Sequence, residues 1–252
     1  MESRIVVVTG GSMGIGYSTA KKFLEHGDKV AILSIDDNIA GKKVEEQLSE
    51  YGEVMWIKAD VSNRDDCKNA VEAVFDRYGR IDVLVNNAGV VGKRTSFLSV
   101  DLDDTLRTLQ INVMGTIQMT SYASQYMKEQ GKGVVVNIGS LCGISANAES
   151  VGYHASKGAV RMVTQSLARE LSPYGIRVVS AAPGWVKTNL VTPEMEDIGN
   201  KLHMTGKILS PEQIAGTVYI LTLDEASGIN GTTVMVDDGY TSFKGVDGIS
   251  YL

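Results

Sequence analysis

Short apolar runs alternate with longer amphipathic segments along this chain of 252 residues. The apolar runs are rich in β-branched residues and nearly free of polar ones, which is typical of strands buried on both faces of a parallel sheet. They cover residues 5–9, 30–33, 54–59, 82–87, 133–139, 177–183 and 233–237. The segments between them have helical spacing, for example 15–27, 62–79, 150–172 and 211–224. The pattern predicts an α/β fold with a doubly wound parallel sheet of about seven strands and helices on both faces.

Helix boundaries and one long loop complete this organisation. Gly27 is suited to end the first helix, and Ser62 or Asn63 to begin the helix of residues 62–79. No linker interrupts the rhythm, so residues 1–252 are expected to form one dinucleotide-binding and catalytic domain. The longest irregular stretch, about 184–209, is predicted to be a substrate loop, because long loops in compact domains usually carry function.

Composition excludes several classes of protein. The formal net charge is −6, and nucleic-acid binding needs clustered Lys and Arg, so nucleic acid is not expected as a partner. No apolar stretch approaches the ~20 residues that span a bilayer, so no membrane role is expected. The two cysteines, Cys67 and Cys142, form neither a disulfide framework nor a zinc spacing. We therefore expect a cytoplasmic protein without a metal.

A glycine-rich loop follows the first predicted strand directly. It reads TGGSMGIG at 9–16, with the spacing Gly10-x-x-x-Gly14-x-Gly16. Glycines at this point allow a tight turn and a close backbone approach to a pyrophosphate at a helix N-terminus, as in a Rossmann sheet. A glycine turn without a ligand is the alternative, and the position between a strand and a helix favours the nucleotide site.

The segment YHASK at 153–157 places a tyrosine one helical turn before a lysine. Residues four apart lie on one helix face, about 5–6 Å apart at Cβ. In an arbitrary helix such a pair is packing and a solvated amine. As a functional pair, the Lys157 ammonium would lower the pKa of the Tyr153 phenol and make it a general acid and base near neutral pH.

The ordered motifs resemble those of the short-chain dehydrogenase/reductase family over nearly the whole chain. The matching segments are TGGSMGIG at 9–16, KADVSN at 58–63, NNAG at 86–89, LQINVMGT at 109–116, NIGS at 137–140, the Y-x-x-x-K pair, PGWVKT at 183–188 and VDDGY at 236–240. Asp238 departs from the pattern, because the family usually has glycine at that position.

The resemblance implies an oxidoreductase that transfers a hydride between a nicotinamide cofactor and a secondary alcohol or ketone. Its catalytic residues would be Asn112, Ser140, Tyr153 and Lys157. Tyr153 would exchange the proton and Ser140 would hydrogen-bond the substrate oxygen. Lys157 would also bind the nicotinamide ribose, and Asn112 would hold a water that links Lys157 to solvent. The cofactor would contact Gly10, Ser12, Met13, Gly14, Ile15, Gly16, Ser34, Asp36, Asp60, Val61, Asn87, Ala88, Gly89, Tyr153, Lys157, Pro183, Gly184, Val186 and Thr188.

The stretch VAILSIDDN at 30–38 bears on the choice of cofactor. Members of the family that prefer NAD usually carry aspartate where this chain has Ser34. Asp36 and Asp37 follow at once, and neither the glycine loop nor residues 34–41 contain Lys or Arg. Two carboxylates without a cation disfavour a 2′-phosphate. We therefore expect NAD(H) rather than NADP(H), with Asp36 as the substitute ribose contact.

Other functions and the substrate remain open at this point. A non-catalytic dinucleotide sensor would need the glycine loop but not the four catalytic positions, and an enoyl reductase would be expected to show a longer Tyr–Lys spacing. Leu141, Cys142 and Trp185, with the 188–207 loop, predict a largely apolar pocket. It suits a hydroxysteroid, a diol or hydroxyketone, or a 3-oxoacyl group. His203 in that loop is a candidate substrate contact.

The resemblance also implies a homotetramer. Helices around 101–128 and 151–172 would pair across one axis, and the final helix and strand across another. The tail at 242–252 is a candidate contact with a neighbouring subunit.

Overall fold

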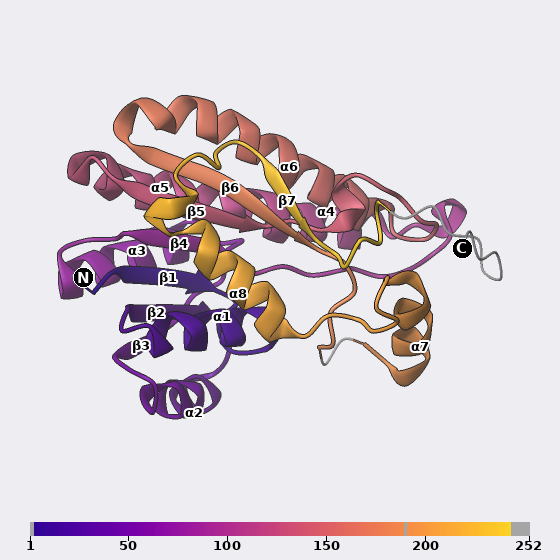
Figure 1. Cartoon of the computed structure of the whole chain (residues 1–252), viewed down its shortest axis with the longest axis horizontal. Helices are drawn as coiled ribbons and strands as arrows, with labels where there is room; N and C mark the ends of the chain where they lie inside the picture. The colour runs from indigo at the N-terminus through magenta and orange to yellow at the C-terminus, as the bar shows by residue number, and fades with distance from the viewer. Residues whose placement is uncertain (1–2, 189–190, 243–252) are drawn as a thin grey trace.

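The computed structural model describes residues 3–188 and 191–242 and contains the predicted sheet (Figure 1). Its strands are β1 (Ile5–Thr9), β2 (Lys29–Ser34), β3 (Val54–Lys58), β4 (Val83–Asn86), β5 (Gly133–Ile138), β6 (Ile176–Pro183) and β7 (Thr233–Val236). They are parallel throughout and lie in the order β3-β2-β1-β4-β5-β6-β7. The predicted fold class is confirmed, and the expectation for the tail largely concerns residues outside the described part.

Helices cover both faces of the sheet (Figure 1). One face carries α1 (Gly14–Glu25), α2 (Asn38–Ser49) and α8 (Pro211–Leu221), and the other carries α3 (Arg64–Tyr78), α5 (Gly115–Gln130) and α6 (Val151–Leu171). A short helix, α4 (Leu102–Leu109), packs on α6. The described helices include none that is long and apolar enough to cross a membrane.

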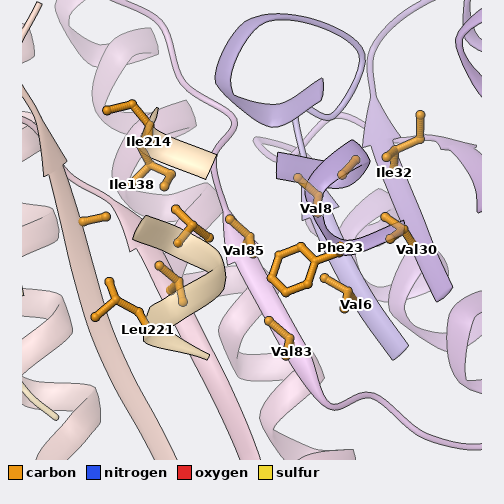
Figure 2. Packing of buried hydrophobic residues seen from close by; sticks show 14 of the residues in the cluster. Val6, Val8, Phe23, Val30, Ile32, Val83, Val85, Ile138, Ile214 and Leu221 are labelled. Atoms are coloured by element: carbon orange, nitrogen blue, oxygen red, sulfur yellow. The ribbon is translucent and has the colours of Figure 1, made fainter. Parts of the chain in front are cut away.

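Strand alternation produces two separate apolar cores. In β1, Val6 and Val8 pack with Phe23 of α1, whereas Ile5 and Val7 join the core under α3 and α5. Figure 2 shows the Phe23 ring beside Val6 and Val8. All five residues are almost completely buried, and full burial of such a side chain contributes about 1.5–3 kcal/mol. Every residue of β1 is therefore apolar up to Thr9.

Two helix termini carry the capping residues that the sequence predicts. Asn63 is the N-cap of α3, because its side chain accepts hydrogen bonds from the backbone of Asp65 and Asp66. Gly27 follows the C-cap residue of α1, His26, and has a φ of 82°, a conformation that glycine adopts without steric cost. Of the two residues that the sequence allows as the N-cap of α3, the structure uses Asn63 and not Ser62.

The expected irregular stretch 184–209 contains a helix, α7 (Pro193–Leu202). The hydroxyl of Thr192 caps its N-terminus, and Pro193 occupies the first turn, where a missing N–H costs nothing. A bridge between Val186 and Leu209 closes the base of the segment. In Figure 1, α7 lies on the side toward which the strand arrows point, which is the end of the sheet where α/β sites form.

Candidate active site

The glycine loop forms a cradle that only glycine permits. Gly10 has a φ of 62° and Gly14 a φ of 55°. A Cβ on Gly16 would lie 2.1 Å from the carbonyl oxygen of Gly10, so any side chain there would collide with the turn itself. Gly14 faces Thr188, whose Cγ2 would lie 3.6 Å from an added Cβ. The loop thus opens the N-terminus of α1 toward the residues that follow β6.

Two polar residues attach this loop to the end of β4. The Thr9 hydroxyl accepts hydrogen bonds from the backbone N–H groups of Asn87, at 2.9 Å, and Ala88, at 3.0 Å. The Asn87 amide in turn donates to the carbonyl oxygens of Thr9 and Gly10. The NNAG segment therefore fixes the shape of the loop. Thr9 was not singled out from the sequence, although a polar residue closing an apolar strand was a usable signal.

Asn112 lies in a π-helical turn, Gln110–Met114, between α4 and α5. Its Oδ1 accepts from the N–H of Val90, and its Nδ2 donates to the Val90 carbonyl and to the Ser156 hydroxyl. Both N–H bonds of the amide are therefore used within the protein. The extra residue in the turn lets Asn112 hold the segment after NNAG against α6. The water that the resemblance assigns to Asn112 remains a prediction.

Ser140, Tyr153 and Lys157 come together at the carboxyl end of β5. The Ser140 hydroxyl accepts from the N–H of Cys142 at 3.1 Å, which holds it at the start of a short 3-10 turn. The nearby Ser140 hydroxyl acts to lower the pKa of the Tyr153 phenol. The Lys157 ammonium lies 5.8 Å from the centre of the Tyr153 ring. The predicted constellation is therefore assembled in space.

Lys157 is a buried cation with a backbone partner. Its side chain reaches back under β5 and donates to the carbonyl oxygen of Ile138 at 2.8 Å. The residue is only 7% exposed, and burial lowers the pKa of its ammonium from 10.5 to about 8. Lys157 still carries its charge at neutral pH, and this charge is held next to the phenol.

The pKa of Tyr153 does not move in the expected direction in this structure. Burial raises it from 10.0 to about 12, and the nearby Ser140 hydroxyl only partly opposes this effect. The Lys157 ammonium donates to Ile138 and not to the phenol, so its field does not overcome desolvation. The resting enzyme therefore holds Tyr153 as a neutral phenol, which is the form that a general acid requires.

The end of β2 forms the corner where an adenosine ribose would bind. Ser34 is buried, and its Oγ accepts a hydrogen bond from the indole N–H of Trp56 on β3 at 2.8 Å. Asp37 is the N-cap of α2 and accepts from Ile39 and Ala40, so it is committed to the helix. Asp36 differs, because its Oδ2 is buried and has no hydrogen-bond partner.

Two further residues predicted to face the adenine lie after β3. Asp60 is exposed and accepts from the backbone and hydroxyl of Ser62, and Val61 is buried against Gly115. In the glycine loop, Met13 is exposed, with Ser12 and Ile15 only partly buried beside it. The corner thus has an apolar wall and an acidic rim.

The segment after β6 is held by His203 and by the loop that follows β7. His203 is buried, and its Nε2 accepts from the N–H of Trp185 at 3.2 Å, so it supports the segment instead of lining open solvent. Asp238 has a φ of 47°, the conformation that explains why the family uses glycine there. Its carboxylate accepts from the N–H and hydroxyl of Thr205. Pro183 ends β6 beside these contacts.

Burial raises the pKa of the Cys142 thiol, which lies beside Ser140, so the residue is a neutral part of the pocket wall at neutral pH. Both ring nitrogens of His154 have partners outside the proposed catalytic group, because the ring contacts the Ser150 carbonyl and the Asn147 N–H. Cys142 therefore adds no negative charge to the wall beside Tyr153.

Comparison with known proteins agrees with this geometry. Residues 10–241 match the family described as Enoyl-(Acyl carrier protein) reductase, which belongs to the short-chain dehydrogenases/reductases. An uncharacterized oxidoreductase of Thermotoga maritima is 38% identical over 96% of this chain and 97% of its own. A 3alpha-hydroxysteroid dehydrogenase of Mediterraneibacter gnavus is 33% identical over 94% of this chain and 96% of its own.

A solved structure, ElxO with NADP bound, superimposes with a TM-score of 0.91 at 29% identity, covering 96% of this chain and 100% of that one. The fold of that structure and the arrangement of Asn112, Ser140, Tyr153 and Lys157 in this chain agree with membership of the same family. The chain therefore belongs to the short-chain dehydrogenase/reductase family and is an NAD(P)-dependent oxidoreductase of secondary alcohols and ketones.

Proposed function

We propose that Tyr153 transfers the proton in this reaction, that Ser140 and Lys157 position and assist it, and that NAD(H) is the preferred cofactor. The observation that carries the proposal is the partly buried Tyr153 phenol, whose pKa the nearby Ser140 hydroxyl acts to lower and whose ring centre lies 5.8 Å from the Lys157 ammonium. The whole chain acts as one domain in this proposal.

The cradle of Gly10, Gly14 and Gly16 fits a dinucleotide, because it leaves the space that a pyrophosphate needs at the N-terminus of α1. Asn87 and Thr188 would border the pyrophosphate and nicotinamide region. When bound, the nicotinamide ring supplies the hydride acceptor or donor. The backbone of Ala88 and Gly89 and the segment Pro183–Val186 would border the ring's side of the site.

Tyr153 begins the reduction of a ketone as a neutral phenol and donates its proton to the substrate oxygen. Ser140 donates a hydrogen bond to the same oxygen and stabilises the negative charge that develops on it. The Lys157 ammonium stabilises the phenolate that remains. In alcohol oxidation the proton travels from the alcohol oxygen to Tyr153. Asn112 positions α6 for both directions through its contact with Ser156.

The preference for NAD(H) is supported by Asp36. Its buried Oδ2 has no hydrogen-bond partner among the described residues and is an acceptor suited to a ribose hydroxyl. A 2′-phosphate would be repelled by the carboxylate, because both groups are negative. Strand pairing does bring Lys58 opposite Ser34, and this cation is the partner that a 2′-phosphate would use. A kcat/KM at least tenfold higher with NADP(H), at equal ionic strength, would overturn the proposal and would point to Lys58.

The proposed substrate is an apolar secondary alcohol or ketone of the hydroxysteroid kind. Leu141 and Cys142 follow Ser140 next to Tyr153, and the resemblance to the family adds Trp185 to this apolar wall. The similarity to a 3alpha-hydroxysteroid dehydrogenase supports this choice. A panel of hydroxysteroids, diols and 3-oxoacyl thioesters, followed by absorbance of the reduced nicotinamide, separates the three classes. Hydroxysteroid turnover below that of the other classes would contradict the proposal.

We further propose a cytoplasmic homotetramer. Leu102 and Leu106 of α4 are 71% and 62% exposed, and Val151 and Met162 of α6 are also exposed, which supports burial of these helices between subunits. Sedimentation at micromolar concentration should show four protomers, and a monomer would refute the assembly. Cell fractionation should recover the protein with cytoplasmic markers.

The catalytic assignment is tested by replacing Tyr153 with phenylalanine. Turnover should fall by about 10³-fold or more, because the proton donor is gone, while the Kd for the cofactor stays within about twofold. Tyr174→Phe, at a half-exposed tyrosine beyond the other end of α6, is the matched control and should keep full activity. A Tyr153→Phe enzyme that retains most of its rate would show that another group transfers the proton.

A further inference from the structure

The contact between Ser34 and Trp56 determines what Ser34 can do. An indole N–H only donates, and a hydroxyl offers one hydrogen and two acceptor sites. Since Trp56 occupies an acceptor site of Ser34, the hydroxyl hydrogen remains to be donated elsewhere. Among residues 3–188 and 191–242, the structure shows no acceptor for the hydrogen of the Ser34 hydroxyl.

Trp56 is itself held rigidly on the edge strand. Its backbone N–H donates to Glu45 of α2 at 2.9 Å, and its ring packs against Gly41 so closely that an added Cβ would lie 2.0 Å from it. Trp56 is 9% exposed. Helix α2 therefore presses the indole into a fixed position from which it reaches Ser34.

Ser34 and Asp36 thus offer one unused donor and one unused acceptor at the same corner. The Ser34 hydroxyl can donate, and the buried Oδ2 of Asp36 can only accept while it is ionised. A ribose 2′-hydroxyl both accepts and donates, so it matches the pair. A 2′-phosphate can use the donor but not the acceptor.

We propose that Trp56 is a specificity-determining positioning residue, which fixes the Ser34 hydroxyl as a donor to the ribose 2′-oxygen while Asp36 accepts from the ribose. Together the three residues replace the single carboxylate that the family usually places at position 34. The proposal rests on the proposed preference for NAD(H). It does not depend on which substrate is used.

The test measures binding of the adenosine half of the cofactor by calorimetry, without turnover. The ligands are ADP-ribose and its 2′-phosphorylated form, and the proteins are the wild type, Trp56→Phe, Ser34→Ala and the double variant. Trp56→Phe should raise the Kd of ADP-ribose about fivefold, the scale of one hydrogen bond. The Kd of the phosphorylated ligand should change less than about twofold, because its several oxygens can meet the hydroxyl in more than one orientation.

The double variant separates positioning from packing. If Trp56 acts through Ser34, Trp56→Phe should change neither Kd by more than about twofold in the Ser34→Ala background. An equal effect in both backgrounds, or an unchanged Kd in the single variant, would overturn the inference. Should Trp56→Phe not fold, benzothienylalanine at position 56 keeps the bicyclic ring, lacks the N–H and is held to the same two criteria.

Failure of the underlying preference gives a different result. A wild-type protein that binds the phosphorylated ligand more tightly would refute the proposed choice of NAD(H), and with it the role of Trp56 in selecting the free hydroxyl. If Trp56→Phe has the same effect with and without Ser34→Ala, while the wild type still prefers ADP-ribose, the role of Trp56 is refuted and the preference for NAD(H) stands.

Discussion

Replacing Lys157 by methionine should stabilise the fold at neutral pH while it removes activity. Lys157 is buried, carries a charge at neutral pH and has one hydrogen bond, to Ile138. Methionine has a similar length and no charge, so it fills the same space without the cost of burying an ammonium. The residue is retained, in our interpretation, for catalysis and at the expense of stability.

The magnitude follows from the pKa of the lysine. Burial lowers it from 10.5 to about 8, and each pKa unit corresponds to about 1.4 kcal/mol, so the charged side chain costs about 3 kcal/mol at pH 7. The lost bond to Ile138 offsets about 1 kcal/mol. The variant should therefore exceed the wild type by about 2 kcal/mol in free energy of unfolding at pH 7.

The size of the effect depends on pH. The unfolded chain binds the proton below 10.5 and the folded protein only below about 8, so stability of the wild type rises with pH between these values. Near pH 10 the cost of burial falls below about 1 kcal/mol. The advantage of the variant should then vanish or reverse, because only the lost hydrogen bond remains.

Urea unfolding followed by circular dichroism at pH 7 and pH 10, at one protomer concentration, measures this difference. Turnover of Lys157→Met should be at least about 100-fold lower than that of the wild type. Lys43→Met, at an exposed position on α2, is the control and should leave stability nearly unchanged at both pH values. A Lys157→Met protein that is less stable than the wild type by the same amount at both pH values would refute the reasoning.

Three further outcomes are expected. Ser34→Asp should sharpen the ratio of kcat/KM for NAD over NADP by about tenfold, since it restores the carboxylate, and a ratio that moves toward NADP would contradict this. Asn112→Ala should lower the urea-measured stability by about 2–4 kcal/mol, because it leaves buried partners of the amide unsatisfied; a loss below 0.5 kcal/mol, about the size of a surface substitution, would argue against it. Burial lowers the pKa of His203, so wild-type thermal stability should fall as pH drops below about 6.5, and His203→Phe should lack this fall.

The sequence by itself determined the layers of the fold and the position of the site. Nearly continuous β-branched runs are typical of strands buried on both faces, so they predict a parallel sheet with helices on each side. The glycine loop and the spacing of Tyr153 and Lys157 are local features, and local geometry is set by residues close in the chain. The glycine loop and the Tyr153–Lys157 pair were therefore predictable from the residues, whereas the roles proposed for Asn112 and Ser140 came from the resemblance to the family.

The tertiary structure decided the properties that arise from packing. The pKa values of Tyr153 and Lys157 depend on how completely each is removed from water, which no spacing reveals. The helix α7 forms within a stretch that reads as a loop, because Thr192 and Pro193 begin it once the segment is anchored at Val186.

The adenosine corner shows the same division most clearly. The sequence located Ser34 and Asp36 but could not show that Trp56, 22 residues after Ser34, donates to its hydroxyl. Nor could it show that Lys58 lies opposite Ser34 on the neighbouring strand. These relations depend on the register of β2 and β3, which pairs Ile32 with Trp56 and Ser34 with Lys58 and cannot be read from spacing along the chain.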